Sequence, residues 1–122
     1  KNLKVLGVTI LTSLNNKSLK EIGHTKNVQQ LVLKQAELIK KSGCDGIVCS
    51  PQESKIIRKK FKNLLIITPG IRLPGDNIND QARVMTPKDA FNNQVSGVVM
   101  GRSLTKGNIK YNVKKLIDHL IQ

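Results

Sequence analysis

The chain has 122 residues, of which 39% are hydrophobic, and carries a formal net charge of +13 with only two Phe and one Tyr. This length suits one domain over residues 1–122 with enough apolar side chains to bury a core. No apolar run approaches the roughly 20 residues of a membrane-spanning helix, and no signal-peptide pattern is present. We therefore expect a cytoplasmic protein without a membrane partner.

The excess of Lys and Arg raises the hypothesis of a nucleic-acid partner. However, the lysines are spread over nearly every amphipathic segment, and three aromatic residues offer little surface for stacking bases. The only compact basic run is Arg58-Lys59-Lys60, which a solvated helix face explains. The sequence thus disfavours a nucleic-acid binder.

Two cysteines and two histidines are the remaining candidates for metal or nucleophile chemistry. Cys44 and Cys49 are not followed by a second Cys or His pair at zinc spacing, so we interpret them as reduced core thiols. His24 and His119 lie in no pattern typical of a base or a ligand, and we expect them to be structural or exposed. The sequence predicts neither a metal site nor a cofactor.

The hydrophobic pattern predicts an alternation of strands and helices. The strands are short, apolar and rich in β-branched residues, and we place them at 4–12, 45–49, 64–67 and 97–100. Helical segments follow at 15–23, 27–42 and 50–61, then from 86 onwards and over the stripe Ile109, Val113, Leu116, Ile117 and Leu120. The first strand is nearly continuous in apolar residues, which predicts burial on both faces.

Helix boundaries have their own signals. Gly23 and Gly43 predict helix ends. Ser50-Pro51-Gln52-Glu53 predicts a helix start with a capping box, because Ser can cap and Glu follows three residues later. Thr86-Pro87 predicts a second capped start, with Asp89 in the first turn.

The strand–helix order predicts an α/β fold with a parallel sheet and right-handed crossovers. Two architectures fit: a small open sheet complete in itself, or four βα units forming the second half of a (β/α)8 TIM-type barrel of about 250 residues. The length favours the half-barrel. Such a half has two unpaired strand edges, so we expect self-association or a pairing partner.

A phosphate site is predicted where the last two strands end. The segments Thr68-Pro69-Gly70-Ile71-Arg72 and Met100-Gly101-Arg102-Ser103 each join a glycine to an arginine. Glycine lets an anion approach the backbone, the helix start that follows adds partial positive charge, and arginine supplies a planar fork for phosphate oxygens. The long polar loop 68–87 between them reads as a lid. The alternative is that these are turn glycines with surface arginines.

These segments resemble a known family. The stretches that carry the resemblance are Val8-Thr9-Ile10-Leu11-Thr12-Ser13, Asp45-Gly46-Ile47-Val48-Cys49-Ser50, Thr68 to Arg72, Asp80-Gln81-Ala82-Arg83-Val84-Met85-Thr86-Pro87, and Gly101-Arg102. In order and spacing they are similar to orotidine 5'-phosphate decarboxylase of the bacterial type, over its carboxyl-terminal half, strands five to eight of the barrel. The resemblance implies conversion of orotidine monophosphate to UMP and CO2 without a cofactor, in pyrimidine biosynthesis. It also implies a homodimer with the active site at the dimer interface.

The resemblance implies roles for five residues. Thr12 matches the residue that contacts the pyrimidine, and Arg72 matches a substrate-binding arginine. Gln81 matches the lid glutamine that spans phosphate and base, while Gly101 and Arg102 match the phosphate-gripping pair. Ser103 departs from the family, which often has Pro there.

The family's catalytic motif Asp-x-Lys-x-x-Asp belongs to the amino-terminal half, and no Asp in this chain has a Lys two positions later. We therefore expect no catalytic residue here and no turnover unless the other half is supplied. The alternative is a non-catalytic remnant that binds nucleotide phosphate weakly or serves as a structural module.

Overall fold

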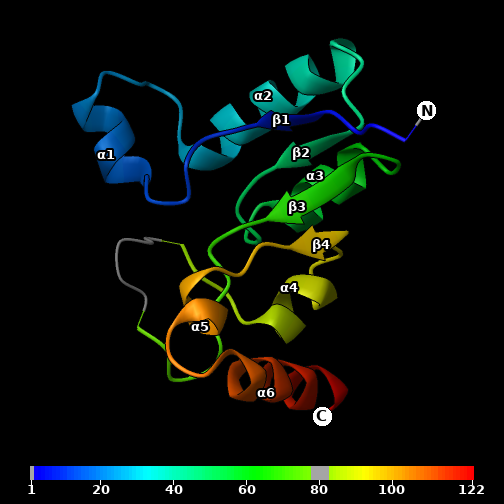
Figure 1. Ribbon diagram of the computed structural model, residues 1–122. Coiled ribbons are helices and arrows are strands. Elements are labelled where there is room, and N and C mark those ends of the chain that lie inside the picture. The colour runs from blue at the N-terminus through cyan, green and yellow to red at the C-terminus, as the bar shows by residue number, and fades with distance from the viewer. Residues whose placement is uncertain (1, 78–82) are drawn as a thin grey trace.

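The computed structural model describes residues 2–77 and 83–122, which form a parallel four-stranded sheet flanked by helices (Figure 1). The strands are β1 (Leu6–Val8), β2 (Gly46–Val48), β3 (Leu65–Thr68) and β4 (Gly97–Val98). The helices are α1 (Asn16–Glu21), α2 (Val28–Lys41), α3 (Ser54–Lys60), α4 (Pro87–Asn92), α5 (Arg102–Thr105) and α6 (Ile109–Ile121). The predicted α/β class with four parallel strands is confirmed.

The strand order decides between the two predicted architectures. Each strand pairs in parallel with the next one along the chain, in the order β1-β2-β3-β4. A doubly wound sheet reverses its strand order at a switch point, whereas a barrel does not. The sheet therefore has the winding of a barrel segment. Among the described residues, β1 and β4 are its two edges.

The core lies between the sheet and its helices. Ile47 and Ile66 point to this side and are completely buried, as are Val32 and Ala36 on α2 and Ile57 on α3. Gly7 of β1 faces the same layer, where an added Cβ would collide with Ile39 of α2. Each strand thus sends alternate residues to the helix layer, as the two-residue repeat of a strand requires.

The opposite face of the sheet is open, and this corrects the prediction for the first strand. Residues 4–12 were expected to be a strand buried on both faces, but β1 spans only Leu6–Val8 and leaves Leu6 and Val8 exposed to 37% and 64%. Leu65 and Val99 are also exposed. The reason is that this face would be the interior of a closed barrel, and no second layer covers it among the residues that the structure describes.

Whether a predicted capping residue starts a helix depends on which partner its side chain binds. The predicted start of a helix at Ser50 is wrong: α3 begins at Ser54, and Glu53 in the N-cap position makes no side-chain cap. The carboxylate of Glu53 instead contacts Arg83 at 2.6 Å. By contrast, Thr86 caps α4 as predicted, accepting a hydrogen bond from the Asp89 N–H at 3.2 Å. Gly43 follows α2 with a φ of 78°, the left-handed value that favours glycine.

Arg58 is more than a residue of a solvated basic face. Its guanidinium donates to the carbonyls of Lys62 and Leu64, which precede β3, and to the Gln94 carbonyl and the Ser96 hydroxyl, which precede β4. Lys59 and Lys60 are exposed, as predicted. Arg58 therefore joins α3 to the starts of two neighbouring strands.

In the described part of the chain, no three Cys, His, Asp or Glu side chains lie close enough together to bind a metal ion. Both cysteines are free; Cys49 is buried and Cys44 is half-buried. His24 is exposed, and His119 accepts a hydrogen bond from the Lys88 N–H at 3.4 Å, which links α6 to α4. These placements confirm the structural or exposed role predicted for the histidines. In the same described residues, no helix is both long and apolar enough to cross a membrane.

Candidate functional site

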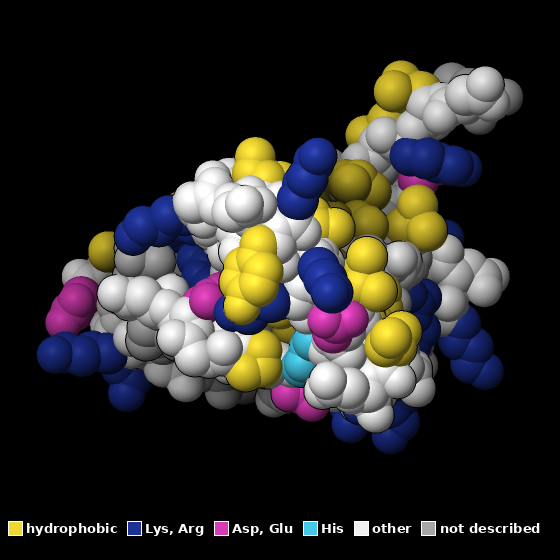
Figure 2. Space-filling model, turned by 60° about the horizontal axis from the view of Figure 1, so that its bottom comes forward, with side chains coloured by type: hydrophobic (Ala, Val, Ile, Leu, Met, Phe, Trp, Pro, Cys, Tyr) yellow, Lys and Arg dark blue, Asp and Glu magenta, His cyan; other side chains and the backbone are white. Residues whose placement is uncertain are grey.

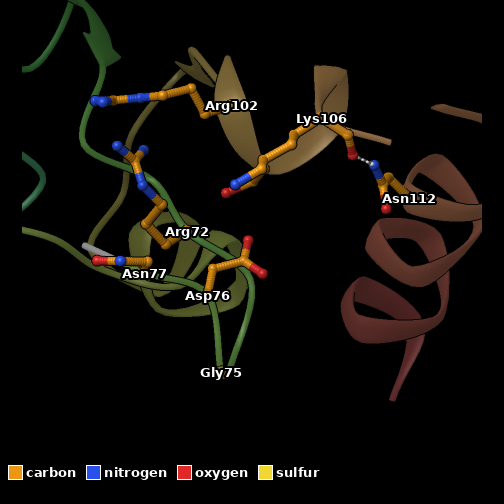
Figure 3. A pocket seen from close by; sticks show the side chains of 8 residues that line it. Arg72, Gly75, Asp76, Asn77, Arg102, Lys106 and Asn112 are labelled. Carbon is orange, nitrogen blue, oxygen red and sulfur yellow. Dashed lines mark hydrogen bonds between the residues drawn. The ribbon is translucent and has the colours of Figure 1, made fainter. Parts of the chain in front are cut away.

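The loops after β3 and β4 meet around a cavity of about 290 Å³ at the carboxyl end of the sheet (Figure 3). The loop after β3 contributes Arg72, Gly75, Asp76 and Asn77, and the segment after β4 contributes Arg102, Ser103, Lys106 and Asn112. In Figure 3 the Arg72 and Arg102 side chains extend to the same side of the cavity, while Lys106 points into the space between Arg102 and Asp76. The structure thus brings the two predicted Gly-Arg turns together.

Arg72 is held by the backbone on both sides of its loop. Gly70 takes a φ of 74°, and its carbonyl accepts from the Met85 N–H at 3.2 Å. The Arg72 N–H in turn donates to the Met85 carbonyl at 3.1 Å. These bonds join the outgoing and returning limbs of the long loop. They fix the backbone from which the Arg72 side chain enters the cavity.

The Arg72 side chain is a buried cation. It is 8% exposed, and its Nη1 donates to the Ile71 carbonyl at 2.9 Å. Its Nε has no hydrogen-bond partner among the described residues. A buried guanidinium with an unmet donor is costly unless an anion satisfies it, so this arrangement favours an anionic ligand.

The other wall of the cavity is built on α5 and α6. The Asn112 amide on α6 donates to the carbonyls of Leu104 and Lys106 at 3.0 and 2.8 Å, which ties α5 to α6. An added Cβ at Gly101 would meet nothing within 4 Å, so there is room for a ligand against its backbone. The helix that starts here is only four residues long. Its partial charge is therefore small, and Arg72, Arg102 and Lys106 supply most of the positive charge.

Sequence reasoning missed several lining residues. Lys106 lies four residues after Arg102, a spacing that could have suggested it. Asp76 and Asn77 fall in the loop already singled out, whereas Asn112 on α6 has no local signal of a role here. The predicted lid residue Gln81 lies outside the described residues, and its role stays a prediction.

Thr12 lines a second, more apolar cavity of about 290 Å³. Its other walls come from the ends of β1, β2 and β3, and they include Val8, Leu11, Cys49 and Pro69. Thr12 is buried and does not line the cavity of Arg72. The loop after β3 contributes to both cavities, since Pro69 lines the apolar one and Arg72 lines the cationic one.

Cys49 is not a nucleophile in the apolar cavity. Burial raises the pKa of its thiol to about 12, and the neighbouring Glu53 carboxylate pushes it in the same direction, against a smaller opposing effect of Arg83. At neutral pH the thiol is protonated, and only a thiolate is an effective nucleophile or metal ligand.

On the face shown in Figure 2 the positive charge is dispersed. Figure 2 shows Lys and Arg side chains distributed over one face of the molecule, with hydrophobic side chains between them. Among the exposed hydrophobic residues of α6 are Tyr111 and Ile117. A continuous basic stripe is the usual footprint of a nucleic-acid binder, and the face in Figure 2 does not show one.

Comparison with known proteins gives a consistent result. The family model described as "Orotidine 5'-phosphate decarboxylase / HUMPS family" matches residues 1–115. Orotidine 5'-phosphate decarboxylase of Coxiella burnetii is 44% identical over 115 residues, which cover 93% of this chain and 49% of the relative. The crystal structure of the enzyme from Lactobacillus acidophilus superposes with a TM-score of 0.75 at 32% identity, over 98% of this chain and 50% of that chain.

A third relative is the orotidine 5'-monophosphate decarboxylase of Methanocaldococcus jannaschii, solved in complex with the inhibitor BMP. It has a TM-score of 0.63 and 26% identity, and the match covers 99% of this chain and 51% of that one. The chain thus spans about half the length of the relatives it matches. With a family match over nearly all of its residues and the fold and cavities described above, the chain belongs to the orotidine 5'-phosphate decarboxylase / HUMPS family.

Proposed function

We propose that the chain is the phosphate- and pyrimidine-binding half of an orotidine 5'-phosphate decarboxylase, with orotidine monophosphate or UMP as its ligand. The observation that carries this proposal is the cavity in which Arg72 and Arg102 meet from the loops after β3 and β4. In barrels of this type a phosphate site is frequently formed by the loops after the last two strands. Family membership makes a nucleotide monophosphate the natural occupant.

The chemistry of the two cavities fits the two ends of such a ligand. A guanidinium matches phosphate oxygens with two parallel hydrogen bonds, and Lys106 adds a third cation. The apolar cavity beside Thr12 can take a flat pyrimidine, with the hydroxyl as its polar contact. Gly101 and Arg102 are proposed to hold the phosphate together with Arg72. Gln81 is predicted to span both ends.

We propose that binding rather than bond cleavage is the task of this half. Decarboxylation in the family depends on an Asp and Lys array that no segment of this chain matches. Contacts with a remote phosphate can supply binding energy that organises a reacting centre elsewhere. The 122-residue chain is accordingly expected to show no decarboxylation alone. A remnant that binds nucleotide phosphate weakly, or a structural module, is the alternative.

The partner is proposed to be a second set of βα units. The open face of the sheet exposes Leu6, Val8, Leu65 and Val99, and both sheet edges are unpaired within the described residues. Open edges and apolar faces of this kind normally pair. An amino-terminal half of the barrel or a further copy of this chain, in a homodimer or larger oligomer, would cover them.

The test is a calorimetric titration with UMP of the wild-type chain, Arg102→Ala and, as a control, Lys59→Ala. Loss of hydrogen bonds to a charged group is worth about 1.5–3 kcal/mol, so Arg102→Ala is expected to weaken binding about tenfold or more. Lys59 is exposed on α3 and lines neither cavity, so its change should leave the affinity within about twofold. Equal losses for both variants would indicate non-specific attraction by net charge and would overturn the proposal.

A further inference from the structure

A buried ion pair lies outside both cavities and joins three loops. Arg83 Nη1 contacts Glu53 Oε2 at 2.6 Å, and each side chain is only 8% exposed. The same guanidinium donates from Nη2 to the Leu11 carbonyl at 3.1 Å. Leu11 follows β1, Glu53 follows β2 and Arg83 is on the returning limb of the loop after β3. One side chain therefore ties together the carboxyl ends of three neighbouring strands.

Arg83 is linked to candidate ligand-binding residues through its Leu11 contact and through its own backbone segment. Leu11 is adjacent to Thr12 of the apolar cavity. Two residues after Arg83, Met85 exchanges backbone hydrogen bonds with Gly70 and Arg72. Arg83 itself lines neither cavity; it faces a separate pocket with Glu53 and Gln52. It can therefore influence ligand binding only through the residues that it holds.

The energetics of such a pair favour a positional role over a purely stabilising one. Moving two charges out of water costs several kcal/mol each, and replacing a buried pair by apolar residues of similar volume is often neutral or stabilising. A planar guanidinium, however, presents its donors in fixed directions, which apolar residues cannot do; here Nη2 bonds to the Leu11 carbonyl while Nη1 forms the ion pair with Glu53. Contacts with fixed directions can keep two ligand-binding loops at a constant separation.

We propose that Arg83, oriented by Glu53, is a positioning residue that sets the separation between the Thr12 cavity and the Arg72–Arg102 cavity. The expected effect of Arg83 on UMP binding rests on the proposed function. The expected effect of Arg83 on the loop backbone does not depend on any ligand. The Arg83 side chain fixes the returning limb, that limb fixes the Arg72 backbone, and the Leu11 contact holds the Thr12 segment at the same time.

The principal variant is the double replacement Glu53→Leu with Arg83→Met, which exchanges the ion pair for apolar side chains of similar volume. The matched control is Glu37→Leu with Lys41→Met, which removes the 3.3 Å ion pair exposed on α2. Hydrogen exchange of the full chain without ligand is the first measurement. We expect the Arg72 and Met85 amides to exchange about tenfold faster or more in the principal variant, with the Cys49 amide of the sheet unchanged.

The second measurement is the UMP dissociation constant by calorimetry, well below the melting temperature. The principal variant is expected to bind UMP about tenfold more weakly, because displacement of a positioned group by a fraction of an ångström is costly. A merely structural pair would lower the melting temperature and leave both the exchange of these two amides and the affinity of the folded chain unchanged. That outcome would overturn the inference.

The outcomes separate this inference from the proposed function. If the wild-type chain does not bind UMP but the exchange of Arg72 and Met85 rises in the principal variant, the proposed function fails and the positioning role stands. If Arg102→Ala weakens binding and the principal variant behaves as wild type, the positioning role fails. Should the double variant not fold, Arg83→Lys keeps the charge without the planar fork, and unchanged exchange at Met85 in that variant would equally refute the inference.

Discussion

Arg58 offers the sharpest test of how this fold is stabilised. Its side chain makes five hydrogen bonds, all to groups that precede β3 or β4. Replacement by alanine removes all five and leaves α3 itself able to form, since alanine is the best helix former. Arg58→Ala therefore measures the connection between α3 and two strand starts, with little contribution from the helix.

The expected cost follows from the surroundings of each acceptor. The Lys62 and Gln94 carbonyls are exposed and can bond to water instead. The Leu64 carbonyl is partly buried and would be left without this partner, at about 1–2 kcal/mol. The Ser96 hydroxyl still accepts from the Ile66 N–H, so its loss is smaller, near 0.5–1 kcal/mol. Together these losses predict a decrease of about 1.5–3 kcal/mol in the free energy of unfolding.

The measurement is urea unfolding at one fixed protein concentration, because self-association would otherwise change the apparent stability. The neighbouring exposed Lys59→Ala is the control and should change the free energy of unfolding by less than about 0.5 kcal/mol. For a chain of this length, Arg58→Ala should also lower the melting temperature by roughly 10 °C. If the two variants unfold at the same urea concentration, the hydrogen bonds of Arg58 are replaced by water at no cost and the reasoning is wrong.

Two further predictions concern Cys49 and the open face of the sheet. The pKa of the Cys49 thiol is about 12 in the folded chain and about 8.5 when unfolded, so the unfolded chain loses its proton first and stability should fall as pH rises from about 9 to 12. Cys49→Ala should remove this part of the alkaline slope, and an identical slope in both chains would contradict the burial argument. Light scattering at about 0.15 M salt is expected to give a dimer or larger species, and Val8→Lys on the open face should reduce the mass. A wild-type monomer would show that the open face needs no cover.

The main features of the fold could be predicted because they depend on local patterns. Apolar β-branched runs correctly predicted four strands. Gly43 correctly marked the end of α2, and Thr86 correctly marked the start of α4. The predicted helix start at Ser50 failed because Glu53 has a stronger partner in Arg83, thirty positions away in a loop. The burial of β1 on both faces failed because burial depends on what covers the sheet, which the pattern of a strand does not specify.

The part of the candidate site that depends only on strand order could be predicted from the sequence. Parallel strands end at the same edge, so the arginines after β3 and β4 had to be neighbours. The contribution of Asn112 and the Glu53–Arg83 pair could not be predicted, because they depend on how α6 and the loops pack in space. Such contacts between residues distant in sequence leave no periodic signal.

The sequential strand order also has a consequence for how this chain folds. Because β1 to β4 pair only with their neighbours along the chain, every pairing closes one loop of moderate length, and none waits for a strand from the far end. Folding rates rise as contacts become more local in sequence, since less loop-closure entropy is lost before a contact forms. The shortest closure joins β2 to β3 through α3. We expect this unit to nucleate folding, with β1 and β4 adding to its two sides while synthesis is still in progress.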